Sequence, residues 1–268
     1  MNTILKIDLT LAGKHVAFDM SVDATCPTDQ EFMTAIRLAT CPEPEVCHLM
    51  ARALRPGDFA VDGGANIGFF TVLMSKLVGS HGYVLAVEPG SNNIFKLEDN
   101  IEINHCSNVE IVKAPLWHKH EKVLLHMCSD GGKNSLAPHA GTRGAAPFFG
   151  VKLNDFADGE IVGNIRLIKL DIEGAEAKAL EGATAFLGKC PFIVMELNVE
   201  ALPKFNSSVT GICDFLRPHG YEPFLLHPDG ALPTYIPRLT KVVPSRLNWN
   251  VLFASFDAVS EAWPEIVA

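Results

Sequence analysis

Short apolar runs alternate with helix-like segments through most of the chain. Apolar runs typical of buried strands occur at residues 59–62, 83–88, 109–114, 166–171, 192–197, 222–226 and 250–255. Segments with helical periodicity stand between them, at 68–78, 92–104, 175–187 and 211–219. Apolar strands that alternate with helices are typical of a parallel sheet covered by helices on both faces. The pattern therefore predicts an α/β fold around a mostly parallel, seven-stranded sheet.

The N-terminal segment has a different pattern. Residues 1–25 alternate polar and apolar positions on either side of Gly13, which predicts a β-hairpin. Helical periodicity follows at 28–40 and again at 43–54, where an Arg-Pro-Gly-Asp turn signal ends it. We therefore expect an N-terminal cap over residues 1–57, made of a hairpin and helices.

The rest of the chain, residues 58–268, has the length expected of one cofactor-binding domain. Within it, residues 115–165 interrupt the alternation of strands and helices, although the segment KVLLHM is strand-like. An insertion of this length inside a compact domain is usually functional. We expect it to shape the substrate pocket together with the N-terminal cap.

Charge and cysteine content limit the kinds of partner. The chain has 22 Lys and Arg against 31 Asp and Glu, a formal net charge of −9, and no basic run, so we expect no nucleic-acid partner. Seven cysteines without a Cys-x-x-Cys pair, and an N-terminus without a signal-peptide pattern, indicate a reduced, cytoplasmic chain. No stretch approaches the roughly 20 apolar residues of a membrane span. Homo-oligomerisation is left open.

The stretch FAVDGGANIGFFTVL, at residues 59–73, joins a strand to a helix through a glycine-rich turn. Such a turn binds either a dinucleotide or S-adenosylmethionine. The dinucleotide pattern G-x-G-x-x-G fails because Ala65 takes its middle position, whereas D-x-G-x-x-x-G fits Asp62, Gly64 and Gly68. An acid in this turn repels a pyrophosphate but favours a sulfonium and an ammonium group, while the helix N-terminus can still take a carboxylate. The turn therefore favours S-adenosylmethionine.

A second acid, Glu88, ends the next apolar run, 20 residues after Gly68. A carboxylate at this position can accept both ribose hydroxyls of either cofactor, so it does not discriminate between them. The competing interpretation is structural, with Glu88 capping the strand end and the glycines making only a tight turn.

Several motifs together resemble the FkbM family of S-adenosylmethionine-dependent methyltransferases. DGGANIGFFT and AVEPG are followed by NSL at 134–136, KLDIEGAE at 169–176, LEGA at 180–183 and the strand IVMELN. The resemblance covers roughly residues 43–255. It implies a Rossmann-like class I methyltransferase fold over 58–268 and methyl transfer to oxygen, most often to a hydroxyl on a sugar or another secondary metabolite.

The turn and the resemblance together assign a cofactor site. We predict that the methionine half lies in the glycine turn, the ribose at Glu88 and the adenine near Leu116. The expected cofactor-binding residues are Asp62, Gly64, Ala65, Asn66, Gly68, Glu88, Leu116 and Asp171.

Acidic residues after the fourth strand of the alternating region are the catalytic candidates. Asp171 ends that strand, where it would face the transferred methyl group, and Glu173 and Glu176 follow within one turn. Asp171 could be the general base, or Asp171 and Glu173 could bind a divalent cation that activates the acceptor hydroxyl. For Glu176 we favour a structural role at the start of a helix. Glu196, at the end of the fifth strand, is the third catalytic candidate.

Four polar residues are predicted to contact the substrate: Asn134, Ser135, Asn198 and His227. If their loop folds over the site, the first two could instead bind the methionine carboxylate of the cofactor, and a mobile polar loop is the competing interpretation. The acceptor is expected to be a small molecule or a glycan. Two other classes of function stay open at this point, namely an NAD-dependent oxidoreductase and a non-catalytic nucleotide-binding module.

Overall fold

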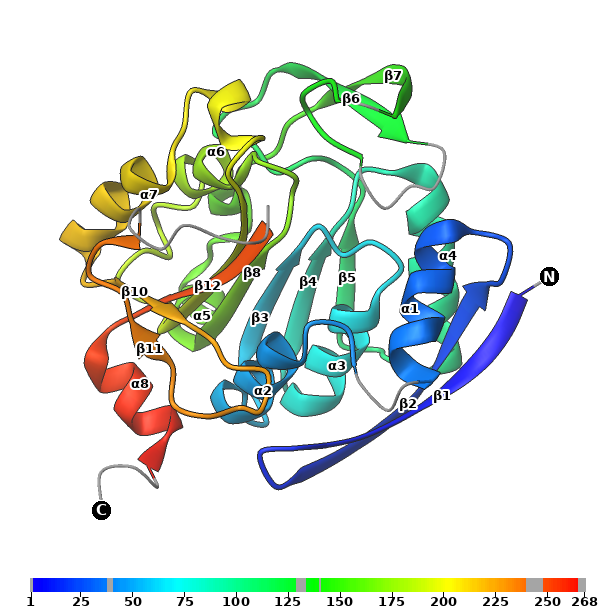
Figure 1. The fold of residues 1–268 in the computed structure, drawn as a ribbon, viewed down its shortest axis with the longest axis horizontal. Coiled ribbons are helices and arrows are strands. Elements are labelled where there is room, and N and C mark those ends of the chain that lie inside the picture. The colour runs from blue at the N-terminus through cyan, green and yellow to red at the C-terminus, as the bar shows by residue number, and fades with distance from the viewer. Residues whose placement is uncertain (1, 38–40, 129–133, 140, 240–247, 265–268) are drawn as a thin grey trace.

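The computed structural model describes residues 2–37, 41–128, 134–139, 141–239 and 248–264 (Figure 1). Its centre is an eight-stranded sheet with the strand order β11-β10-β12-β9-β8-β3-β4-β5. The strands are β3 (Phe59–Gly63), β4 (Tyr83–Val87), β5 (Val109–Val112), β8 (Ile165–Leu170), β9 (Phe192–Asn198), β10 (Glu222–Leu225), β11 (Thr234–Tyr235) and β12 (Asn248–Ala254). Neighbours from β5 to β9 pair in parallel, whereas β12 is antiparallel to both β9 and β10.

The α/β architecture with a mostly parallel sheet is thus confirmed. The seven longer strands are those predicted from the apolar runs, and the two-residue β11 adds an eighth at the edge. Two residues give no periodicity to read, which is why the sequence did not indicate β11.

Helices cover both faces of the sheet. The helices are α1 (Pro27–Arg37), α2 (Pro44–Ala53), α3 (Phe69–Val78), α4 (Ser91–Ile103), α5 (Gly159–Asn164), α6 (Glu176–Glu181), α7 (Val209–Leu216) and α8 (Phe256–Ala262), with 3-10 turns at Leu153–Phe156, Leu202–Phe205 and Arg217–His219. One apolar cluster joins α2, α3 and α8 to one face, and a second joins α6 and α7 to the other. None of these described helices is long and apolar enough to cross a membrane.

The N-terminal hairpin forms as expected, from β1 (Asn2–Leu11) and β2 (Lys14–Asp23). It packs outside α3 and α4, and its buried Met20 belongs to the same apolar cluster as α2 and α3 (Figure 1). Asn100 in α4 fixes the contact by accepting a hydrogen bond from the Ser21 N–H at 2.6 Å. The cap and the following residues thus share one core, and a domain boundary at residue 57 stays a prediction. The first predicted helix, 28–40, forms up to Arg37; residues 38–40 lie outside the described part of the chain.

The insertion at 115–165 is more regular than a loop. It contains an antiparallel hairpin of β6 (Lys122–Cys128) and β7 (Thr142–Phe149), followed by a 3-10 turn and α5. In Figure 1 this hairpin lies beyond the ends of the central strands toward which their arrows point. That position places the insertion over the edge of the sheet where ligands of α/β proteins bind.

One helix is shorter than predicted. The periodicity at 175–187 predicts a long helix, but α6 ends at Glu181. The carbonyl of Gly182 accepts a hydrogen bond from the Asn154 N–H at 2.9 Å, and a Cβ on Gly182 would lie 2.3 Å from the Trp117 carbonyl oxygen. The insertion therefore packs against the chain here and ends the helical ladder. The C-terminal α8 was not predicted either, although Ser255 caps it by accepting from the Ala258 N–H at 3.1 Å.

Candidate active site

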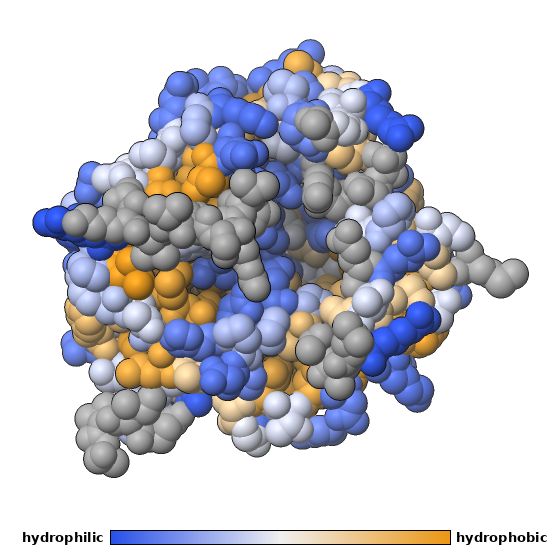
Figure 2. Space-filling view, in the orientation of Figure 1, coloured by the Kyte–Doolittle hydropathy of each residue, from blue (hydrophilic) through white to orange (hydrophobic). Residues whose placement is uncertain are grey.

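An open pocket lies at the carboxyl ends of β3, β4 and β8. Its empty space, counted out to the open mouth and including open solvent, is about 640 Å³. Figure 2, which has the orientation of Figure 1, shows a hollow in the middle of the face turned toward the viewer. The lining residues are Gly64, Asn66, Val87, Glu88, Pro89, Asn93, Pro115, Leu116, Leu125, Asn134, Ser135, Leu136, Asp171, Ile172, Glu173 and Ala175.

The glycine turn between β3 and α3 forms the floor of this pocket. Gly64 has a φ of 84°, and a Cβ there would lie 1.9 Å from the carbonyl oxygen of Asp171. Gly68 has a φ of 95°, and a Cβ there would lie 2.6 Å from Leu97 of α4. Only glycine meets both demands at these positions. The turn also places Asn66 in the left-handed region, with a φ of 50°, a strained conformation of the kind that clusters at functional sites.

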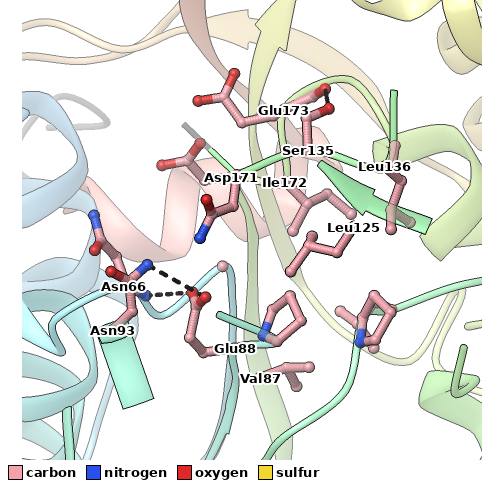
Figure 3. Close-up of a pocket in the computed structure, with 16 residues that line it drawn as sticks. Asn66, Val87, Glu88, Asn93, Leu125, Ser135, Leu136, Asp171, Ile172 and Glu173 are labelled. Atoms are coloured by element: carbon pink, nitrogen blue, oxygen red, sulfur yellow. Dashed lines mark hydrogen bonds between the residues drawn. The ribbon is translucent and has the colours of Figure 1, made fainter. Parts of the chain in front are cut away.

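Glu88 follows β4 and is held by three N–H donors. Its Oε2 accepts from the Asn66 backbone at 2.9 Å, and its Oε1 accepts from the Gly90 backbone at 2.7 Å and from Asn93 Nδ2 at 3.3 Å (Figure 3). Burial raises the pKa of Glu88 to about 7, although these hydrogen bonds act in the opposite direction. The carboxylate is thus oriented, nearly enclosed and open to further hydrogen bonds from the pocket.

Asp62 does not line the pocket. Its side chain is 1% exposed and accepts a hydrogen bond from Thr71 Oγ1 at 2.6 Å. Burial raises its pKa against the attraction of Lys169. Its other oxygen, Oδ1, has no hydrogen-bond partner among the described residues. The predicted cofactor residues Ala65 and Gly68 likewise lie behind the pocket wall, so direct contacts from these three residues stay a prediction.

Asp171 lies at the opposite side of the pocket from Glu88 (Figure 3). Its Oδ2 accepts from Lys169 Nζ at 3.0 Å, and burial and Asp171 both contribute to the raised pKa of Glu196. Lys169 is 2% exposed, and its Nζ lies 4.7 Å from the centroid of the Phe70 ring. Burial alone lowers the pKa of Lys169, but the surrounding carboxylates, Asp171 foremost, outweigh it and raise that pKa above its ordinary value.

Strand alternation explains why these polar groups meet. Lys169 pairs with Asp62 in β3, and Glu196 in β9 pairs with Asn250 in β12. Each of the four lies two residues along its strand from an apolar residue: Lys169 from Leu167, Asp62 from Ala60, Glu196 from Val194 and Asn250 from Leu252. These apolar residues all belong to the cluster that packs under α2 and α3. Since side chains two apart share a face, the four polar residues cover the same face of the sheet near its carboxyl edge.

Glu43 brings the N-terminal cap to this polar face. It immediately precedes α2 and accepts a hydrogen bond from Asn250 Nδ2 at 3.0 Å. Burial raises the pKa of Glu43 to about 7, with Lys169 opposing the shift. Burial, Asp171 and Glu43 raise the pKa of Glu196 to about 9. The cluster therefore retains protons at neutral pH, which limits its negative charge.

Asn134 and Ser135 reach the pocket from the insertion. Ser135 exchanges backbone hydrogen bonds with His126 of β6, at 2.7 and 3.0 Å, and its Oγ donates to the Glu173 carbonyl at 3.2 Å. Asn134 Oδ1 accepts from the Cys128 N–H at 3.0 Å. These contacts place both residues in the pocket wall and do not support the alternative of an unanchored polar loop.

The other predicted site residues have local roles or lie elsewhere. Glu173 lines the pocket, with a φ of 55°. Glu176 is buried, and its Oε1 accepts from the Ile172 and Gly174 N–H groups at 3.1 Å, as a structural residue would. Asn198 Oδ1 accepts from the backbone after β9. His227 contacts Thr234 at 2.8 Å. Neither Asn198 nor His227 lines the pocket, and their contact with substrate stays a prediction.

A metal site is not formed by the side chains that the structure describes. Among them, no group of three His, Cys, Asp or Glu residues is arranged to hold an ion. Asp171 and Glu173 are thus two acids without a third ligand of this kind in the described part of the chain.

Several lining residues were not identified from the sequence. Pro115, Val87 and Leu125 supply apolar surface beside the predicted Leu116, and Asn93 contacts Glu88. Asn93 was within reach of prediction, since it lies five residues beyond Glu88 in the first turn of the following helix. Leu125 was not, because its place depends on how the insertion folds back over the sheet.

Solved structures similar to this chain share little sequence with it. An rRNA methylase from Streptococcus thermophilus is 10% identical, with a TM-score of 0.46 and a match over 78% of this chain and 93% of that one. An S-adenosylmethionine-dependent methyltransferase from Aquifex aeolicus is 15% identical (TM-score 0.43, 79% and 88%). A precorrin-6y C5,15-methyltransferase from Geobacter metallireducens is 16% identical (TM-score 0.42, 78% and 87%). Comparison with curated proteins gives no match.

A family model identifies the chain more directly. The model of the methyltransferase FkbM domain matches residues 62–223, which is more than half of the chain and includes the glycine turn, Glu88 and Asp171. Together with the strand order, in which only β12 and the short β11 run against the other strands, this match confirms the class I methyltransferase fold. It does not favour the oxidoreductase alternative. The chain belongs to the FkbM family of S-adenosylmethionine-dependent methyltransferases.

Proposed function

We propose that this protein transfers a methyl group from S-adenosylmethionine to a hydroxyl oxygen of a small-molecule or glycan acceptor, such as a sugar or another secondary metabolite. The observation that carries the proposal is the placement of Glu88 and Asp171 on opposite sides of one pocket in an FkbM methyltransferase fold. Glu88 suits the ribose, and Asp171 stands where the reacting end of the cofactor would lie.

The residues of the pocket fit this cofactor. The Glu88 carboxylate can accept hydrogen bonds from hydroxyl groups. Pro115, Leu116 and Leu125 offer apolar surface to an adenine ring. The close approach of Gly64 to the Asp171 carbonyl oxygen keeps the floor of the pocket free of side chains. When bound, the cofactor supplies an electrophilic methyl group on a positively charged sulfonium. Carboxylates on that side of the pocket would favour this positive charge.

Asp171 is proposed as the general base. In the transfer, the acceptor O–H bond would break and its proton would go to the Asp171 carboxylate. The acceptor oxygen would bond to the methyl carbon as the carbon–sulfur bond breaks, and the electron pair of that bond would stay on the sulfur, so that S-adenosylhomocysteine leaves. Lys169, through its 3.0 Å contact with Oδ2, would fix the direction of that carboxylate. A positioned base of this kind contributes about 10²- to 10⁴-fold to a rate.

The same surroundings support an acceptor that is uncharged near the reacting hydroxyl. Asp171 acts electrostatically on both Glu43 and Glu196, and Glu43 and Glu173 also act on Glu196. A phosphate or carboxylate on the acceptor would therefore be repelled there. The net charge of −9 acts in the same direction for nucleic acids. A neutral polyol avoids this repulsion and can hydrogen-bond to the carboxyl groups.

Two measurements test the proposal. Calorimetry should detect binding of both S-adenosylmethionine and S-adenosylhomocysteine; absence of binding by both would contradict the cofactor assignment. Transfer of a labelled methyl group to a panel of neutral glycosides should then identify an acceptor. If the chain binds the cofactor but transfers methyl to no hydroxyl compound and only to amines or thiols, the proposed acceptor atom is wrong. Binding without any transfer would favour the non-catalytic alternative.

A pair of matched variants tests the base. Asp171→Asn should lower kcat by about 10²-fold or more while leaving S-adenosylhomocysteine binding within about threefold. Asp214→Asn, an exposed carboxylate on α7 outside the pocket, should change neither. Activity that is lost on treatment with EDTA and restored by Mg²⁺ would instead support the divalent-cation alternative at Asp171 and Glu173.

A further inference from the structure

Three polar groups converge on the space in front of Gly90, directly after Glu88. A Cβ built on Gly90 would lie 2.5 Å from Asn134 Nδ2, 2.8 Å from Glu88 Oε1 and 3.6 Å from Asn93 Nδ2. These groups come from three separate parts of the chain: the insertion, the end of β4 and the start of α4. All three residues line the pocket.

The chemistry of this set is one acceptor between two donors. The Glu88 carboxylate accepts hydrogen bonds, and each amide NH2 group donates them. A vicinal diol offers the complementary set, because each of its hydroxyls donates one hydrogen bond and accepts others. A phosphate would meet the Glu88 carboxylate and be repelled, whereas a lone carbonyl would offer that carboxylate no donor beyond the three that already hold it.

We infer that Asn93 and Asn134 form, with Glu88, a clamp for the 2′- and 3′-hydroxyls of the cofactor ribose. The inference rests on the proposed function, since it names contacts of the same cofactor. It reassigns Asn134 from the acceptor, where the sequence placed it, to the cofactor. It also gives a binding role to Asn93, which sequence patterns did not identify.

The clamp is held in place before any ligand binds. Asn134 is anchored through its Oδ1 to the Cys128 N–H at 3.0 Å, which directs its NH2 group toward Gly90. Asn93 and Glu88 are each 4% exposed, and the 3.3 Å contact between them is the longest of the three hydrogen bonds to the Glu88 carboxylate. If Asn93 turns toward a hydroxyl oxygen, the backbone donors of Asn66 and Gly90 still hold Glu88.

Gly90 offers a direct test because its backbone does not require glycine. Its φ of −76° and ψ of 115° suit any residue, so Gly90→Ala adds only a methyl group to the space between the three polar groups. We expect this variant to weaken S-adenosylhomocysteine binding by about 30-fold or more in calorimetry. Gly159→Ala is the matched control, since a Cβ there meets nothing within 4 Å, and it should bind like the parent protein.

Deoxy analogues test the amide groups one by one. Asn93→Ala and Asn134→Ala should each weaken S-adenosylhomocysteine binding by about five- to tenfold, as expected for loss of one hydrogen bond. The 2′-deoxy and 3′-deoxy forms of S-adenosylhomocysteine should bind less tightly to the parent protein by a similar factor. For the analogue that lacks the partner hydroxyl, each variant should lose little further affinity. Melting temperatures of all variants, measured without ligand, separate these effects from unfolding.

The outcomes separate this inference from the function on which it rests. If the parent protein does not bind S-adenosylhomocysteine, the proposed function fails. If it binds, but both asparagine variants bind equally well, or lose the same factor with the deoxy analogues as with the full ligand, the clamp is wrong. An Asn134→Ala variant that binds the cofactor normally and raises only the acceptor KM would return Asn134 to the acceptor site and overturn the inference.

Discussion

Gly64 is constrained in two ways that act at the same atom. Its backbone has a φ of 84°, and the Asp171 carbonyl oxygen occupies the space where a Cβ would stand. The first constraint is common in turns, but the second arises because β3 and β8 lie side by side as they enter the pocket. Gly64 therefore links the conformation of the turn to the position of Asp171.

Replacement of Gly64 should damage binding and stability together. Gly64→Ala must separate the ends of β3 and β8, and we expect a loss of about 2–4 kcal/mol in the free energy of unfolding, measured with denaturant. S-adenosylhomocysteine binding should weaken by at least about 30-fold. Gly13→Ala is the control, because Gly13 also has a positive φ, of 77°, but open space around it. It should cost about 1–2 kcal/mol and leave binding unchanged; equal effects from the two variants would show that φ alone matters.

Glu88 makes the affinity for the cofactor depend on pH. Its pKa is raised to about 7, and hydroxyl donors from a ribose favour its ionised form, so ligand binding should release a proton below pH 7. Affinity for S-adenosylhomocysteine, measured by calorimetry, should therefore fall between pH 8 and pH 6, by at most about tenfold per pH unit. Glu88→Gln should bind more weakly and lose most of this dependence. A parent protein whose affinity is constant over this range would argue against Glu88 as the ribose ligand.

The sequence identified the residues whose place depends on one strand and the turn after it. Glu88 and Asp171 end apolar runs, Asn66 stands in the turn after one, and all three line the pocket. It did not identify Asn93, nor the approach of Glu43 to Lys169, because those contacts depend on how distant segments pack. The position of Asp62 in the motif indicated an acid near the cofactor. Its burial away from the pocket lining depends on the tertiary structure, which the motif does not describe.

At the scale of elements, the β6–β7 hairpin is the part least visible in the sequence. Its strands pair only with each other, apart from the bridge between His126 and Ser135, so neither the central sheet nor a regular spacing indicates where it lies. The bridge carries Asn134 and Ser135 to the pocket, and Leu125 of β6 adds apolar surface. The hairpin thus supplies one wall of a site whose floor belongs to the central sheet.

Cofactor binding should therefore protect this wall from hydrogen exchange. The Ser135 and His126 N–H groups already form backbone hydrogen bonds, and a ligand held against Asn134 opposes the opening that exposes them. We expect peptides covering residues 134–137 to exchange at least about fivefold more slowly with saturating S-adenosylhomocysteine. Peptides from β1 serve as the control, since no residue of β1 lines the pocket, and they should be unaffected. Unchanged exchange at 134–137 in a protein that binds the ligand would mean that the hairpin is no part of the cofactor site.

At the scale of the whole molecule, the cap and the sheet enclose an unusual number of acidic groups. The N-terminal cap contributes Glu43, the central strands contribute Asp62 and Glu196, the loop after β4 contributes Glu88, and the start of α6 contributes Glu176. Burial is the largest cause that raises the pKa of each. Burying these polar groups beside the pocket lowers the stability of the folded protein. A purely structural core would not require such a polar interior.

These groups predict that the ligand-free protein is more stable in mild acid than in mild base. In the unfolded chain a Glu side chain titrates near its ordinary pKa of 4.5, whereas in the folded chain Glu88 and Glu176 titrate near 7 and Glu196 near 9. Between those values the folded state binds more protons than the unfolded state. The contribution of these three groups to the free energy of unfolding is therefore fully present below about pH 4.5 and is lost as the pH rises through 7 toward 9. His48, whose pKa burial lowers, and Cys41, whose pKa a hydrogen bond with Cys47 lowers, act in the opposite sense, but they are two groups against several.

The melting temperature should accordingly fall by roughly 5 °C or more between pH 5.5 and pH 8.5. Glu176→Gln is the informative variant, because an amide oxygen can keep the hydrogen bonds that Oε1 accepts from Ile172 and Gly174 while the titrating proton is removed. The slope of melting temperature against pH should be shallower in this variant, with most of the gain above pH 7. Glu200→Gln, at an exposed position, should reproduce the parent slope. A melting temperature that is constant or rises over this range would mean that the buried carboxyl groups are ionised at little cost, and that the polar face beside Asp171 is better solvated than its burial indicates.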